Sequence, residues 1–149
     1  MAFSFQRQDA RQSIPHAGIR LRDSLACVHV FDVGHFKKLK AWQHAQTLAV
    51  VSKPLIDRLP ASERSGLADQ WRRAASSVAL NIAEGASRFG NKEFRKHLGI
   101  ARASLDEIEA IIELAVGLDY LKRVDVGRVV AVRDECARTV YGLIRKLQP

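Results

Sequence analysis

The sequence predicts an all-α fold, an antiparallel up-down-up-down four-helix bundle. Four segments repeat their apolar residues at intervals of three and four, which places them on one face of a helix. Only a few residues connect one segment to the next, so neighbouring helices should run antiparallel. The chain has 149 residues, and 7% of them are aromatic while Ala, Val and Leu are abundant. This composition suits close helix packing more than a β-sandwich.

Residues 1–35 precede the bundle, which we predict to span residues 36–149. They show no sustained helical or strand period, and Pro15, Gly18 and Gly34 interrupt them. We predict a flexible or disordered tail with a short strand around residues 26–31. The alternatives are a basic arm, because four arginines are scattered through the segment, and a start placed too early in the chain.

The first helix is predicted over residues 35–58. Its apolar stripe consists of Ala41, Ala45, Leu48, Val51, Leu55 and Leu59. Pro54 lacks a backbone N–H and its ring crowds the preceding turn, so it should kink the helix near Val50. In the loop that follows, Ser62 is a candidate N-cap for the second helix.

The second helix, from Leu67 to Gly85, has three ordered faces, which indicates that it is covered on more than one side. The core stripe consists of Leu67, Trp71, Ala74, Ala75, Val78 and Ile82. A face of small residues, where another backbone can approach, consists of Ala68, Ser76, Ala79 and Ala83. The third face, which we call the polar seam, consists of Gln70, Arg73, Ser77, Asn81 and Glu84. Gly85 should end the helix in the left-handed conformation.

Two interpretations of the polar seam stay open. The first is a hydrogen-bonded seam between helices or subunits, since a guanidinium, a hydroxyl, an amide and an acid can satisfy one another. The second is a surface that contacts a ligand or RNA. We favour the first, because the carboxylate of Glu84 would repel phosphates.

The third helix should begin after Asn91, a candidate N-cap, with Glu93 in its first turn. Its core stripe consists of Phe94, Leu98, Ala101, Leu105, Ile108, Ile112 and Ala115. Two further rows lie off this stripe, one apolar and one of small residues: Ile100, Ile111 and Leu114, and Gly99, Ala103 and Ala110. Because one core does not need these rows, they favour contacts between subunits.

The fourth helix should run from Asp125, a candidate N-cap, to about Leu147. Its apolar stripe includes Cys136, which we expect to be a small buried hydrophobic residue. Arg133 falls within the stripe, and a buried guanidinium needs a partner. The short connection places Glu109 or Glu113 opposite it, so we predict an ion pair there, or else a head group that reaches the bundle surface.

The net charge of +8 favours an anionic partner, most simply nucleic acid. The predicted nucleic-acid-binding residues are Lys37, Lys38, Lys40, Arg72, Arg88, Lys92, Arg95 and Lys96. Along the third helix, cations come first and acids last, which opposes the helix dipole, so local helix stability does not explain the order. No aromatic platform is evident, and contacts should go mainly to phosphates. A solvated charged surface is the alternative, and the two basic regions need not share an end of the bundle.

No constellation of residues indicates catalysis. The five histidines have no metal-ligand spacing, the segment 85–90 lacks the context of a phosphate-binding loop, and His97 is expected to be packed or hydrogen-bonded. We therefore predict a protein that is no enzyme and uses neither metal nor cofactor. No apolar run approaches the ~20 residues that cross a membrane, so we expect no membrane partner and a cytoplasmic location.

Gln70, Arg73, Ala74, Ser77 and residues 81–85 resemble the signature of the 23S rRNA intervening sequence protein family of bacteria. Residues 36–39, 42–45, 59–67, 100–109 and 118–121 resemble other parts of the family pattern, so the resemblance covers residues 36–147. Three positions depart from the pattern: Ala79 stands where proline is usual, Ala103 where glycine is usual, and Pro54 interrupts the first helix.

The resemblance implies a small four-helix bundle encoded within insertions in 23S ribosomal RNA genes. A related group consists of accessory proteins of the reverse transcriptases of diversity-generating retroelements, which are basic, pentameric and bind nucleic acid. From this we expect a non-catalytic, ring-forming homopentamer that binds RNA or RNA–DNA, with a reverse transcriptase as a candidate protein partner. The alternative is an oligomeric protein-interaction scaffold, or a reverse-transcriptase accessory subunit without sequence readout, whose charge serves only solubility.

Overall fold

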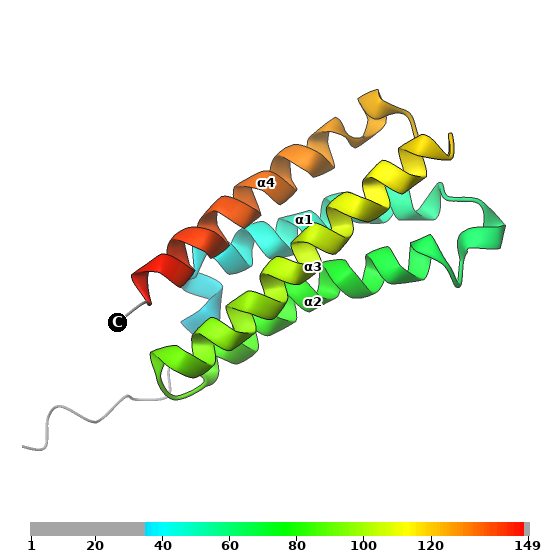
Figure 1. Cartoon of the computed structure of the whole chain (residues 1–149). Helices are drawn as coiled ribbons and strands as arrows, with labels where there is room; N and C mark the ends of the chain where they lie inside the picture. The colour runs from blue at the N-terminus through cyan, green and yellow to red at the C-terminus, as the bar shows by residue number, and fades with distance from the viewer. Residues whose placement is uncertain (1–34, 148–149) are drawn as a thin grey trace, which may run out of the picture. The chain divides into compact units, whose positions relative to one another are not determined.

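A computed structural model describes residues 35–147, and the regular elements of this part of the chain are all helices, joined by short connections, with no strand (Figure 1). In chain order the elements are η1 (His35–Lys38), α1 (Lys40–Asp57), η2 (Ala61–Glu63), α2 (Leu67–Ser87), α3 (Asn91–Gly117) and α4 (Arg123–Lys146). The four α-helices form a bundle, as the sequence predicts. The tail predicted over residues 1–35 and its short strand lie outside the described residues, apart from His35 in η1.

Side-chain contacts fix the direction of neighbouring helices. Residues at the end of one helix contact residues at the start of a neighbouring helix in the pairs Arg58–Asp125 (α1 and α4), Asn81–His97 (α2 and α3) and Glu113–Arg123 (α3 and α4). The pairs Ala41–Cys136, Ser77–Ser104 and Leu105–Arg133 continue the same order. Helices α1 and α4, α2 and α3, and α3 and α4 are therefore antiparallel. The stripes of all four helices meet in one core, whose largest fully buried side chains include Trp71, Leu48, Ile82, Leu105 and Val140.

Helix α1 begins later than predicted, because residues 35–38 form the short 3-10 helix η1. Its buried face includes Ser52 and Ile56, whereas Val51 is only partly buried. Pro54 lies within α1, which continues to Asp57. The kink expected at Val50 stays a prediction.

The N-termini of α2, α3 and α4 differ from the predicted caps. At α2, the Glu63 carboxylate accepts a hydrogen bond from the Leu67 backbone N–H at 3.1 Å, and so fills the role expected of Ser62. Helix α3 includes Asn91, because Gly90 with a φ of 88° makes the turn before it. Helix α4 starts at Arg123, since the chain is still extended at Lys122; Asp125 then lies in the first turn, where Arg58 pairs with it at 2.7 Å.

Gly85 does not end α2, so that prediction is wrong. The helix continues to Ser87, and Gly85 is helical and buried. A Cβ atom built on Gly85 would lie 2.7 Å from Cβ of His97 and 2.7 Å from Cδ2 of Phe94. Glycine is needed here because α3 crosses too closely for any side chain.

The off-core rows of α3 are only partly exposed. Ile111 is 2% exposed, so the expectation that it lies outside the core is wrong; α2 packs close enough to bury this flank, Ser104 included. Ile100 and Leu114 are 50% and 53% exposed, and Ala103 and Ala110 lie on the surface beside them. We call Ile100, Ala103, Ala110 and Leu114 the α3 strip.

Candidate nucleic-acid interface

The antiparallel order gathers basic residues from three parts of the chain at one end of the bundle. The start of α1, the α2–α3 connection and the end of α4 lie together there (Figure 1). We define the basic end by the cations of these segments: Lys37, Lys38, Lys40, Arg88, Lys92, Arg95, Lys96, Arg145 and Lys146. The sequence-based view that the two predicted regions need not share an end is corrected, because two antiparallel helices return the chain to the end where it started.

Seven of the eight predicted binding residues lie at the basic end, and Arg72 does not. Arg72 is in the first two turns of α2, 16 residues before Arg88, which corresponds to about 24 Å of helix. It pairs with Asp69 at 3.6 Å. Arg145 and Lys146 were not among the predicted residues. The predicted up-down-up-down topology could have identified them, because it brings the end of α4 to the same end of the bundle as the start of α1.

Within residues 35–147, two glutamates make ion pairs with cations of the basic end, and Lys40 lies close enough to Glu135 to help lower the pKa of its carboxyl. Glu84 pairs with Arg88, and Glu93 pairs with Lys96 at 2.7 Å. The hydrogen bond from each basic partner lowers the pKa of the glutamate, so both stay ionised. Within residues 35–147, Lys92, Arg95 and Lys146 make no ion pair. The basic end therefore carries uncompensated positive charge.

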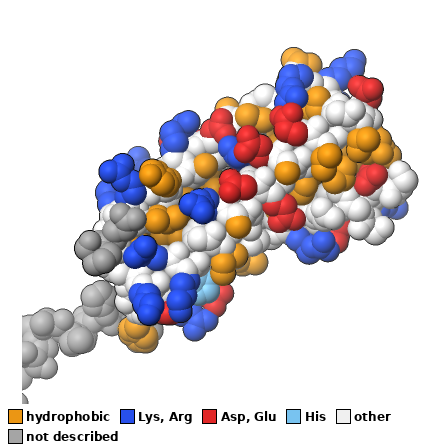
Figure 2. All heavy atoms as spheres, in the orientation of Figure 1, with side chains coloured by type: hydrophobic (Ala, Val, Ile, Leu, Met, Phe, Trp, Pro, Cys, Tyr) orange, Lys and Arg blue, Asp and Glu red, His pale blue; other side chains and the backbone are white. Residues whose placement is uncertain are grey.

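The other end of the bundle mixes both signs of charge. Its acids are Asp57, Glu63, Asp69, Glu113, Asp119 and Asp125, and its cations are Lys53, Arg58, Arg64, Arg72, Arg73, Lys122, Arg123 and Arg128. On the face shown in Figure 2, blue side chains gather where α4 ends, and red ones lie further along α3 and α4. The excess of positive charge is therefore larger at the basic end of the bundle than at the opposite end.

The polar seam is a real contact between helices over part of its length. Ser104 donates a hydrogen bond to the Ser77 hydroxyl at 2.9 Å, and Asn81 donates to the same hydroxyl at 3.1 Å. His97 Nδ1 lies 3.2 Å from Oδ1 of Asn81, so His97 is hydrogen-bonded, as expected. Ser77 and Asn81 therefore join α2 to α3 with partners that the sequence analysis did not assign to the seam.

The remaining seam residues lie on the surface. Gln70 is exposed, Arg73 pairs with Asp69, and Glu84 pairs with Arg88. These local pairs within α2 satisfy the charges without reaching α3.

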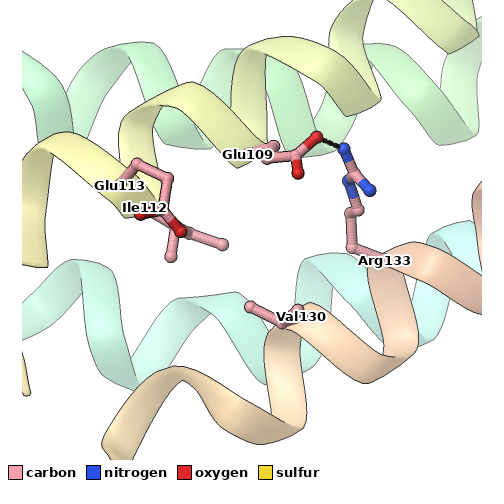
Figure 3. A pocket seen from close by; sticks show the side chains of 5 residues that line it. All are labelled: Glu109, Ile112, Glu113, Val130 and Arg133. Atoms are coloured by element: carbon pink, nitrogen blue, oxygen red, sulfur yellow. Dashed lines mark ion pairs between the residues drawn. The ribbon is translucent and has the colours of Figure 1, made fainter. Parts of the chain in front are cut away.

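Arg133 makes the ion pair that the sequence predicts, with Glu109 as partner (Figure 3). Its side chain is 13% exposed, and it also donates to the Leu105 carbonyl at 3.3 Å and to Asp134 at 2.7 Å. Glu113, the other candidate, pairs with Arg123 instead. The small cavity that Arg133 and Glu109 line has a volume of about 30 Å³, room for about one water molecule.

We expect Arg133→Met to leave the free energy of unfolding within about 1 kcal/mol of the wild type, because the substitution also removes the cost of burying the charge. Arg133→Ala should cost about 1–3 kcal/mol, since it also loses the packing of the stem. Urea denaturation measures both. A loss above about 3 kcal/mol for Arg133→Met would show that the ion pair itself stabilises the bundle.

The described residues contain no cluster of side chains that could hold a metal ion. Cys136 is buried, and its burial raises the pKa of the thiol to about 12, so it is no reactive thiolate at neutral pH. Within residues 35–147, no helix is apolar over the length that a bilayer requires. A second hollow, of about 330 Å³, lies between α1 and α4 and is mainly apolar, with Val50, Val51 and Val129 in its lining.

Comparison with known proteins gives a family match and a structural match. The sequence model of the 23S rRNA-intervening sequence protein family matches residues 37–142. A crystal structure from Bacteroides thetaiotaomicron, of a protein with unknown function from the S23 ribosomal protein family, is similar with a TM-score of 0.64 and 21% identity. The similarity covers 70% of this chain and 98% of that one, and it shows the fold. No curated protein matches the chain.

Proposed function

The chain belongs to the 23S rRNA-intervening sequence protein family, and from this premise we propose that it is a non-catalytic, oligomeric, cytoplasmic protein that binds RNA or RNA–DNA through its basic end. One observation carries the proposal: three separate parts of the chain bring their cations to one end, and Lys92, Arg95 and Lys146 make no ion pair there within residues 35–147. Solubility alone would not require the cations to be grouped at one end of the bundle.

The contacts would go mainly to phosphates, so binding should depend steeply on salt. Each neutralised phosphate changes the logarithm of the affinity by roughly 0.7–0.9 for a tenfold change in salt. No base-reading motif is present among the described residues, and sequence selectivity should be weak.

We expect Arg95→Glu with Lys96→Glu to lower the affinity for a structured RNA by roughly tenfold or more and to reduce its salt slope. The matched control is Arg64→Glu with Lys122→Glu, which changes the net charge equally at the opposite end, and which should retain most of the affinity. Gel shifts over a series of salt concentrations measure both quantities.

Equal losses in the two double variants would mean that net charge alone attracts RNA and that the basic end is not the site. If the wild type binds neither RNA nor RNA–DNA at low salt, the alternative takes over: a protein-interaction scaffold or a reverse-transcriptase accessory subunit. Light scattering on every variant shows that its assembly is unchanged.

The α3 strip supports self-association. It consists of two large apolar residues and two alanines on the surface of α3, whereas the hollow between α1 and α4 belongs to a different face. Contact between two different surfaces repeats around a ring until it closes. We propose such a ring, and the family resemblance favours five subunits.

We expect light scattering to give the wild type a mass well above the 16.6 kDa of one chain. Ile100→Glu with Leu114→Glu should shift this mass toward the monomer, because two carboxylates would be buried in the contact. Leu80→Glu, at a residue 67% exposed on α2, is the control and should leave the mass unchanged. A monomeric wild type at micromolar concentration would contradict self-association.

A further inference from the structure

An exposed aromatic ring lies among the arginines near the basic end. Tyr141, in the last two turns of α4, is 55% exposed, and the guanidinium carbon of Arg145 lies 6.0 Å from the centre of its ring. Arg138, one turn earlier in α4, is also exposed, although it pairs with Glu135. Tyr141 was not among the residues predicted from the sequence to bind nucleic acid.

The register of α3 against α4 brings two more arginines to the level of Tyr141. Arg133 contacts Leu105, so in antiparallel helices Tyr141, eight residues on, is level with residue 97. Arg95 and Arg102 precede Glu109 by fourteen and seven residues, and a seven-residue repeat keeps the same helix face. Since Glu109 faces Arg133 on α4, Arg95 and Arg102 lie on the flank of α3 toward α4.

This group of residues differs from a plain phosphate-binding surface. Within residues 35–147, Arg95 and Arg102 make no ion pair, so they are available to phosphates. The exposed ring of Tyr141, at their level on the neighbouring helix, offers a flat face to a base, and the guanidinium of Arg145 can add to the stack.

We propose that the basic end takes unpaired nucleotides, with a base stacked on Tyr141 and the adjoining phosphates held by Arg95 and Arg102. This rests on the proposed binding of nucleic acid and names its substrate class. A duplex keeps its bases stacked on one another, so it can use the arginines but not the ring. Single-stranded RNA should therefore bind more tightly than a duplex with the same number of phosphates.

The test uses a 12-nucleotide single-stranded RNA carrying 2-aminopurine, and a duplex with the same total number of phosphates. The wild type should quench the 2-aminopurine and bind the single strand more tightly. Tyr141→Leu, which keeps an apolar side chain but loses the ring, should weaken single-strand binding by roughly fivefold or more. It should leave duplex binding and the salt slope unchanged, because no phosphate contact is removed. Tyr141→Phe keeps the ring and should behave as the wild type.

The outcomes separate the two proposals. If Arg95→Glu with Lys96→Glu weakens binding while Tyr141→Leu changes neither the single-strand affinity nor the quenching, stacking is refuted and nucleic-acid binding stands. Equal affinity of the wild type for single strand and duplex also refutes stacking. If neither RNA binds at low salt, both proposals fail.

Discussion

Trp71→Ala should lower the free energy of unfolding by about 3–5 kcal/mol, the usual cost of truncating a buried Trp to Ala. Trp71 is fully buried and is the largest side chain of the core. Alanine would leave a cavity in the core, and packed cores close such cavities only partly. Because small domains have only about 5–15 kcal/mol of stability, this one substitution removes a large share of it.

Chemical denaturation followed by circular dichroism measures the effect. Leu80→Ala is the control on the same helix: its side chain is 67% exposed, and the change should stay within about 0.5 kcal/mol. Trp71→Phe should cost less than Trp71→Ala, because it keeps a ring and removes Nε1, a buried donor with no acceptor among the described residues. A loss for Trp71→Ala no larger than that of the control would show that the core is not packed around this residue.

Gly85→Ala should cost about 1–3 kcal/mol, although alanine is the better helix former. In an open helix the same change is worth about 0.5–1 kcal/mol in favour of alanine. At Gly85, however, the new methyl would lie 2.7 Å from carbons of His97 and Phe94, so α2 and α3 would have to move apart. This movement would also stretch the bonds of Ser77 and Asn81 to α3.

The matched control is Gly127→Ala in α4, where no atom lies within 4 Å of the added Cβ. It should stabilise the bundle by about 0.5–1 kcal/mol, as helix propensity predicts. The sign of the difference between the two variants is the result that matters. If Gly85→Ala also stabilises the protein, the close approach of α3 is absent in solution.

Helical periodicity predicts the fold well and its close contacts poorly. The stripes of α2, α3 and α4 follow from spacing because a bundle buries one face of each helix, and Arg133 stands out because its charge interrupts such a face. Gly85 was misread because a glycine near the end of a helical pattern resembles a terminator. Only the position of α3 shows that Gly85 is instead the point where α2 and α3 pack closely. Ile111 was misplaced for the same reason, since its burial depends on how closely α2 approaches.

The candidate interface was predicted in part. Lysines and arginines can be read directly, but their grouping depends on which helix ends share a side of the bundle. Arg72 does not join the group because it lies near the start of α2, at the other end of the bundle, whereas Arg145 joins it although it lies fifty residues beyond Arg95. That Tyr141 is level with Arg95 and Arg102 follows only from the register of α3 against α4, which the contact of Arg133 with Leu105 establishes.

The concentration of charge at one end gives each bundle a permanent dipole moment along its helix axes. The macrodipoles of antiparallel helices largely cancel, so this moment comes from side chains. The field of a distant polyanion would exert a torque on this dipole and turn the basic end toward the polyanion before any contact forms. If the protein binds RNA as proposed, encounters would begin in a productive orientation, and the rate of association, more than the rate of release, would respond to ionic strength.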